Sequence, residues 1–122
     1  MKANRRSLGI KGERAVEVLL KQQGYSILDR NFRSRFGEID LIVTKGNSLV
    51  FVEVKTRSTN AFGFPEEAVD AKKQRQVRRM AAEYISKCGK KGYFSEIRFD
   101  VAAVTANSDG QVENIRILEG AF

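Results

Sequence analysis

The first stretch of regular hydrophobic spacing in the chain predicts a helix. From Gly12 to Gln23, the apolar side chains of Val16, Leu19 and Leu20 recur every three or four residues, and Gly24 is a typical helix end. Glu13 lies three and seven residues before Val16 and Leu20, so it falls on or beside the buried stripe, where an acid is unusual. A glutamate in a first turn also favours the helix dipole, which is a purely structural reason for its position.

A second helix is predicted from Asp70, a plausible N-cap, to about Cys88, with Gly89 as its end. Its apolar stripe consists of Val77, Met80, Ala81, Tyr84, Ile85 and Cys88. Its first two turns hold the basic residues Lys72, Lys73, Arg75, Arg78 and Arg79. Such a run is ordinarily a solvated helix face.

Alternating β-branched and aromatic residues predict the strands. Tyr25–Phe32 is a short strand, and 37–44 and 49–56 form a hairpin around the two-residue loop Gly46-Asn47. Segments 96–105 and 112–118 add two more strands, joined by a turn at 107–110. The order α-β-β-β-α-β-β predicts one α/β (α+β) domain over residues 1–122, with a mixed β-sheet flanked by helices.

The hairpin register gives the two faces of these strands different characters. The loop makes Ile42 face Phe51, and continuing inward, Asp40 faces Glu53 and Glu38 faces Lys55. These four charged residues then share one face. The opposite face is apolar and should bury against a helix; it holds Ile39, Leu41, Val43, Val50, Val52 and Val54.

Acids facing each other across a ladder carry an electrostatic cost. Two like charges about 4 Å apart repel by roughly 1 kcal/mol in water and by about 4 kcal/mol at an effective dielectric of 20. A bound divalent cation, with Lys55 as a partial counter-charge, is the simplest way to offset the repulsion between Asp40 and Glu53. The structural alternative is that the acids face solvent and pair across the ladder, as Glu38 and Lys55 would.

Composition narrows the chemistry. The chain has 22 Lys and Arg against 15 Asp and Glu, a net charge of +7, which favours a polyanionic partner such as nucleic acid or an anionic membrane surface. It has no histidine, so mechanisms that need a catalytic or zinc-binding histidine are excluded. The single cysteine fits a reducing cytosol, and no apolar run is long enough for a membrane span.

Carboxylates on rigid strands suit Mg²⁺ or Mn²⁺. Asp40 and Glu53 would supply two ligands, and Glu13 a third from the first helix. A water activated at such an ion would attack a phosphodiester, with Lys55 orienting or deprotonating it and stabilising the developing charge. The basic helix would then bind nucleic-acid backbone. Phe62 and Phe64, in a loop over 58–65, would either stack on bases or anchor the loop.

Two levels of family resemblance rest on these residues. Asp40 followed by Glu53-Val54-Lys55 resembles the PD-(D/E)XK nuclease motif, with Ile39 in place of the proline. The segments Gly12-Glu13, 37–42, 51–57, Lys73-Gln74 and 98–101 together resemble the uncharacterised YraN-like bacterial family over nearly the whole chain.

The resemblance implies a restriction-endonuclease-like core related to archaeal Holliday-junction resolvases. It also implies that Glu13, Asp40 and Glu53 are metal ligands together with the Val54 carbonyl, that Lys55 is catalytic, and that Gln74 matches a polar position on the second helix.

The sequence thus predicts a cytoplasmic, Mg²⁺-dependent DNA endonuclease, an endodeoxyribonuclease of the PD-(D/E)XK type. Its nucleic-acid-binding residues would be the basic set on the second helix, Gln74 and Arg57. A non-catalytic nucleic-acid-binding module and an interaction subunit of a DNA-processing complex remain as alternatives. A homodimer would suit a symmetric branched substrate, although no self-complementary surface is evident in the sequence.

Overall fold

A computed structural model describes residues 5–58, 69–88 and 94–122 of the chain. The elements are α1 (Arg5–Gln22), β1 (Ser26–Ser34), β2 (Gly37–Lys45), β3 (Ser48–Ser58), α2 (Ala71–Cys88), β4 (Glu96–Ala106) and β5 (Val112–Leu118). This order confirms the predicted α+β fold class. The loop expected over 58–65, with Phe62 and Phe64, lies outside the described residues except for Ser58.

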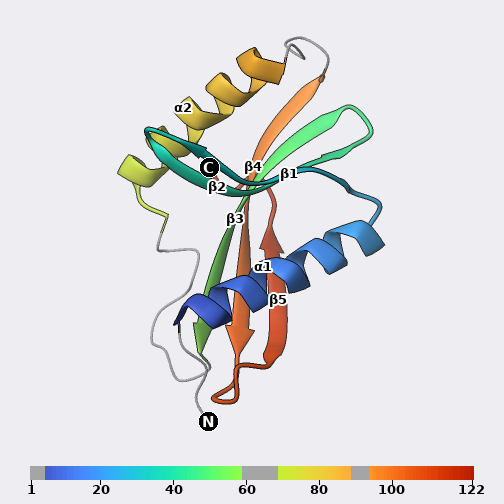
Figure 1. Cartoon of the computed structure of the whole chain (residues 1–122). Coiled ribbons are helices and arrows are strands. Elements are labelled where there is room, and N and C mark those ends of the chain that lie inside the picture. Colours follow the sequence, from blue (N-terminus) through green and yellow to red (C-terminus); the bar gives the residue numbers. More distant parts are fainter. Residues whose placement is uncertain (1–4, 59–68, 89–93) are drawn as a thin grey trace.

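The five strands form one mixed sheet in the order β1-β2-β3-β4-β5. β3 and β4 run parallel, and α2 is part of the connection between them; the other neighbouring strands are antiparallel. The two helices cover opposite faces (Figure 1). One apolar cluster joins α2 to the sheet through Ile42, Phe51, Val77, Met80 and Tyr84. The other joins α1 to the sheet through Val16, Leu20, Val43, Val50 and Val52.

The first helix begins earlier than the hydrophobic spacing predicted. α1 starts at Arg5 rather than at Gly12. Gly9 and Gly12 interrupt the apolar pattern of its first half, and glycine has a low helix propensity, so the sequence signal is weak there. The predicted N-cap of α2 is confirmed, because the Asp70 carboxylate accepts the Lys73 backbone N–H at 2.8 Å.

The predicted hairpin register is confirmed only near the loop. The ladder between β2 and β3 runs from Lys45–Ser48 to Leu41–Val52 and includes the Ile42–Phe51 pair. The expected pairs further along, Asp40 with Glu53 and Glu38 with Lys55, are not part of it. Glu38 is instead paired with Arg33 of β1, at 2.9 Å.

A kink in the β1–β2 ribbon explains why the register prediction failed. Asn31 of β1 has a φ of 50°, the left-handed region, and the ladder passes from Arg30–Leu41 to Phe32–Ile39 without a pair between Asn31 and Asp40. The two strands reverse their faces at this point. Ile39 therefore packs on the α2 side of the sheet, and its predicted place beside Leu41 and Val43 was wrong.

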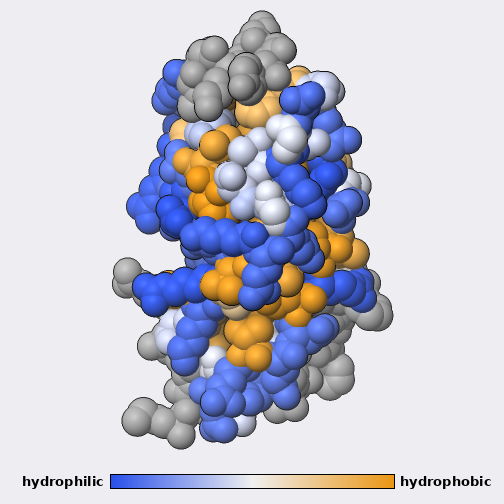
Figure 2. All heavy atoms as spheres, turned by 90° about the vertical axis from the view of Figure 1, so that its right-hand side faces the viewer, coloured by the Kyte–Doolittle hydropathy of each residue, from blue (hydrophilic) through white to orange (hydrophobic). Residues whose placement is uncertain are grey.

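Few large hydrophobic side chains are exposed in the described part of the chain. Among the described residues, Ile10, Val18 and Ile97 are the exposed large hydrophobic residues. On the face seen in Figure 2, a band of hydrophilic side chains divides the apolar atoms into separate patches. Within the described ranges, neither helix has the length and apolarity to cross a bilayer.

Candidate metal centre

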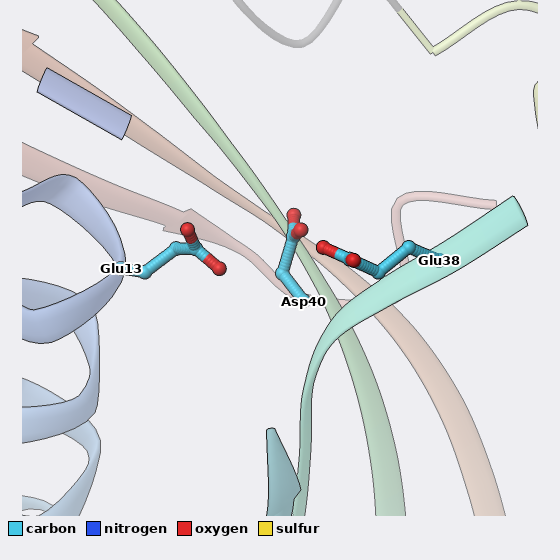
Figure 3. A group of neighbouring side chains, drawn as sticks. All are labelled: Glu13, Glu38 and Asp40. Atoms are coloured by element: carbon cyan, nitrogen blue, oxygen red, sulfur yellow. The ribbon is translucent and has the colours of Figure 1, made fainter. Parts of the chain in front are cut away.

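Three carboxylates from two elements meet at the kink in β2. Glu13 from α1 and Glu38 and Asp40 from β2 each offer one oxygen, and these oxygens lie within 4.8 Å of one another. Figure 3 shows the three side chains pointing toward a common centre, Glu13 from the helix and the other two from the strand. Asp40 also accepts the backbone N–H of Val54 at 2.7 Å, which ties β2 to β3 where their ladder has ended.

Gly12 allows α1 to bring Glu13 this close to the sheet. A Cβ built on Gly12 would lie 2.1 Å from the Thr56 Oγ1 of β3, so a side chain at this position would force the helix or the Thr56 side chain to move. Next to this contact is a cavity of about 320 Å³ lined by Leu8, Gly9, Glu13, Asp40, Val54 and Thr56. The helix contact therefore places two carboxylates in the wall of an open cavity.

Glu53 is the most buried acid near the cluster. The residue is only 2% exposed, and its Oε1 has no hydrogen-bond partner in the described part of the chain. Its Oε2 lies 3.7 Å from the Lys73 Nζ of α2. Burial, reinforced by the negative charge of Asp40 and opposed by Lys73 and Lys55, raises the pKa of Glu53 to about 7.

Asp40 is shifted in the same direction. Burial raises the pKa of Asp40 to about 6, against the lowering effect of the Val54 N–H; Glu13 and Glu38 raise it further, and Lys55 lowers it. The ammonium of Lys55 thus acts on the pKa values of both Asp40 and Glu53. The structure brings together the four residues that the sequence predicted for catalysis: Glu13, Asp40, Glu53 and Lys55.

These residues fit a hard divalent cation. The candidate ligands are carboxylate oxygens, the donors that Mg²⁺ and Mn²⁺ prefer. The unpartnered oxygen of Glu53 is a buried acceptor that an ion would satisfy. The group of Val54 that contacts the cluster is its N–H, bound to Asp40; the predicted role of its carbonyl stays a prediction.

The basic residues predicted to bind nucleic acid lie mostly on the exposed side of α2. Lys72, Arg75, Arg78 and Arg79 are exposed. Two of them rest on aromatic rings, with the Arg78 guanidinium 4.9 Å from the centre of Phe99 and that of Arg79 5.3 Å from the centre of Phe36. Both guanidinium groups are therefore within cation–π distance of a ring.

The remaining predicted residues are less exposed. Lys73 is half-buried beside Glu53, and Arg57 is half-buried on β3. Gln74 donates its amide to the Val69 carbonyl at 3.2 Å and lines a different cavity, of about 460 Å³, near the end of the chain. The structure does not bring the Gln74 side chain to the acid cluster.

Sequence reasoning missed two members of this centre, Glu38 and Asn31. Glu38 was assigned to a pair with Lys55, although its spacing of two from Asp40 already placed both acids on one side of the strand. Nothing in the sequence around Asn31 indicated a role in this centre. The one hint was an isolated asparagine within a strand, since asparagine tolerates the left-handed region.

Comparison with known proteins gives a consistent family and no activity. A family model described as "Uncharacterised protein family UPF0102" matches residues 12–104. A UPF0102 protein from Moorella thermoacetica is 43% identical over 122 residues, covering 100% of both chains. Relatives with the same family name from Caldicellulosiruptor saccharolyticus and Rhodococcus jostii are also 43% identical, over 98% and 93% of this chain and 99% and 97% of their own.

Proposed function

The chain belongs to the uncharacterised protein family UPF0102, and we propose that it is a metal-dependent endonuclease that hydrolyses phosphodiester bonds in DNA. The membership agrees with the YraN-like resemblance of its motifs. It names no reaction, so the proposal rests on the chemistry of the acid cluster.

The observation that supports it most is Glu53. A fold that only needed a buried polar residue would satisfy both oxygens of that residue, because an unpaired buried acceptor costs about 1–3 kcal/mol. Here one oxygen is left without a partner beside a second acid, Asp40. Such an arrangement is destabilising in the protein alone and becomes favourable when a cation is shared between the carboxylates.

The residues of the centre would have two roles: the acids would bind the ion, and the lysine would act on the substrate. Asp40, Glu53 and Glu13 would hold the ion, which when bound supplies a Lewis acid for the phosphodiester oxygens and lowers the pKa of water. Lys55, whose charge acts on both Asp40 and Glu53, would orient the attacking water and stabilise the negative charge that develops on the phosphate.

The exposed basic residues of α2 would hold the DNA backbone next to this centre. Contacts from Arg and Lys to phosphate oxygens dominate nucleic-acid affinity and position the substrate without reading its sequence. The first turns of α2 are close to the cluster, since Lys73 reaches Glu53. A backbone bound along this helix would therefore pass near the carboxylates.

The rival function is a nucleic-acid-binding module that uses no metal, and the contact between Lys73 and Glu53 favours it. The ammonium of Lys73, 3.7 Å from the Glu53 carboxylate, supplies positive charge where an ion would otherwise act. Lys73→Met separates the two functions. In either case the metal-free variant loses the Lys73 contact, worth up to about 1 kcal/mol. In a nuclease the variant has lost a competitor of the cation, so Mn²⁺ binds and raises its stability, whereas in a metal-free module added Mn²⁺ leaves its stability unchanged.

Cleavage of labelled linear, forked and four-way DNA in Mg²⁺ or Mn²⁺ tests the proposal directly. We expect metal-dependent cutting by the wild type that is lost in Asp40→Ala and in Lys55→Ala and retained in Lys87→Ala, an exposed lysine of α2 that pairs with Glu83. DNA binding that is unaffected by metal and by Asp40→Ala, with no cutting of any substrate, would establish the binding module instead.

A further inference from the structure

Asn31 is placed to organise the acid cluster. Its side-chain nitrogen donates to the Glu13 Oε1 at 2.8 Å and to the Glu38 Oε1 at 3.1 Å. Carboxylates only accept hydrogen bonds, so the NH₂ end of the amide must face both acids. One neutral group thus links a carboxylate of α1 to a carboxylate of β2.

The backbone of Asn31 is as unusual as its contacts. Among the described residues it is the only non-glycine with a positive φ, 50°, and it stands inside a strand where extended backbone would be normal. This conformation interrupts the β1–β2 ladder opposite Asp40, and it coincides with the reversal of faces that turns Asp40 and Glu38 toward α1. Left-handed conformations of non-glycine residues concentrate at functional sites.

Glu38 is held on two sides as a result. Its Oε1 accepts from Asn31, and its Oε2 accepts the Arg33 Nε at 2.9 Å. The Arg33 side chain is 82% exposed, so this second contact is weak. Each carboxylate oxygen keeps further acceptor capacity, and the carboxylate stays within 4.8 Å of those of Glu13 and Asp40.

We propose that Asn31 is a positioning residue that makes Glu38 a ligand of the metal centre, holding the carboxylates of Glu38 and Glu13 at coordinating distance around one cation. This inference rests on the proposed function for the existence of the centre. That a ligand belongs there is indicated independently by Glu53, which is 2% exposed, has an unpartnered oxygen and is repelled by the negative charge of Asp40. Partners that orient metal ligands typically change metal affinity by 10–100-fold when removed.

Titration of the full chain with Mn²⁺, followed by calorimetry, tests this role. Asn31→Gly keeps the left-handed backbone available but removes the amide, so the Kd for Mn²⁺ should rise about tenfold. Glu38→Gln should weaken Mn²⁺ by a similar factor, and the double variant by less than the product of the two.

Asn114→Gly, the same substitution at an exposed position of β5, is the matched control and should leave the Kd unchanged. Unfolding in EDTA is measured for every variant. If Asn31→Gly is less stable in EDTA but binds Mn²⁺ as the wild type does, the role of Asn31 is structural and the inference is wrong. Wild-type affinity in Glu38→Gln overturns it as well.

The same titration separates this inference from the nuclease proposal. If the wild type does not bind Mn²⁺, the metal centre fails, and the inference fails with it. If the wild type binds Mn²⁺, Asn31→Gly weakens that binding, and no DNA is cut, the inference is supported and the nuclease proposal is overturned.

Discussion

The buried acid Glu53 should make the metal-free protein more stable when its charge is removed. Its pKa in the folded protein is about 7, against an ordinary value of 4.5, and burial is the largest cause. Between these two pH values the folded state keeps a proton that the unfolded chain has released. Raising the pH through this window therefore favours unfolding.

The size of the effect follows from that difference. At about 1.4 kcal/mol for each pH unit, the shift corresponds to a penalty of about 3 kcal/mol, complete at pH 8 and absent below pH 4.5. Glu53→Gln removes this penalty and also the contact with Lys73, a half-buried lysine at 3.7 Å. The pKa of about 7 already includes the effect of Lys73, which lowers it, so we expect a net gain of about 3 kcal/mol at pH 8.

Urea unfolding in EDTA at pH 5 and pH 8 measures the free energy of unfolding of the wild type and of Glu53→Gln at each pH. Glu53→Gln should be close to the wild type at pH 5 and clearly more stable at pH 8. Excess Mn²⁺ should then stabilise the wild type but not the variant, because a ligand that binds only the folded state raises its stability. Glu113→Gln, the same change at an exposed position of β5, should stay within about 0.5 kcal/mol at both pH values. A variant less stable than the wild type at pH 8 would refute the claim that the Glu53 carboxylate is destabilising in the metal-free protein.

Three further predictions concern the neighbourhood of Glu53. Gly12→Ala should lower stability by about 1–3 kcal/mol, because its Cβ would meet the Thr56 Oγ1 at 2.1 Å, and Thr56→Ala should restore much of the loss in chemical unfolding. Asp70→Ala should cost about 1 kcal/mol by the same measurement, since the carboxylate caps α2 through the Lys73 N–H, without changing the Kd for Mn²⁺. Affinity for Mn²⁺ should rise from pH 5.5 to pH 8 and level off above about pH 7, because burial raises the pKa of Asp40 to about 6 and that of Glu53 to about 7. Calorimetry in two buffers should show that Mn²⁺ binding releases protons at pH 6. An affinity independent of pH would contradict this prediction.

The fold was predictable from local signals that the tertiary structure leaves intact. The Gly46-Asn47 loop sets the hairpin register as far as the Leu41–Val52 pair, because a two-residue loop allows only one alignment of the two strands. The signals for the N-cap at Asp70 and for the apolar stripe of α2 were also contained in neighbouring residues of the sequence. The helical first half of α1 was not, since Gly12 serves a contact with Thr56 on a distant strand, and no property of residues 5–12 alone reveals that contact.

The candidate centre was predictable in its residue types but not in its geometry. The sequence identified Glu13, Asp40, Glu53 and Lys55 correctly as neighbours, yet for the wrong reason, a regular ladder that would have set Asp40 directly against Glu53. A regular antiparallel pair would place their Cβ atoms about 5 Å apart and fill the space between the strands with backbone hydrogen bonds.

The irregularity is what makes the centre accessible. Because β2 leaves β3 at Asp40, the Val54 N–H is free to bind the Asp40 carboxylate, and a cavity of about 320 Å³ lies beside it. The same turn directs Ile39 to α2 and presents Glu38 to Glu13. In a regular β1–β2 ribbon, Ile39 would face α1, and Glu38 and Asp40 would face α2, away from Glu13. The kink at Asn31 therefore has two effects on the structure: it places Ile39 in the apolar cluster under α2, and it assembles carboxylates from α1 and β2 around one point.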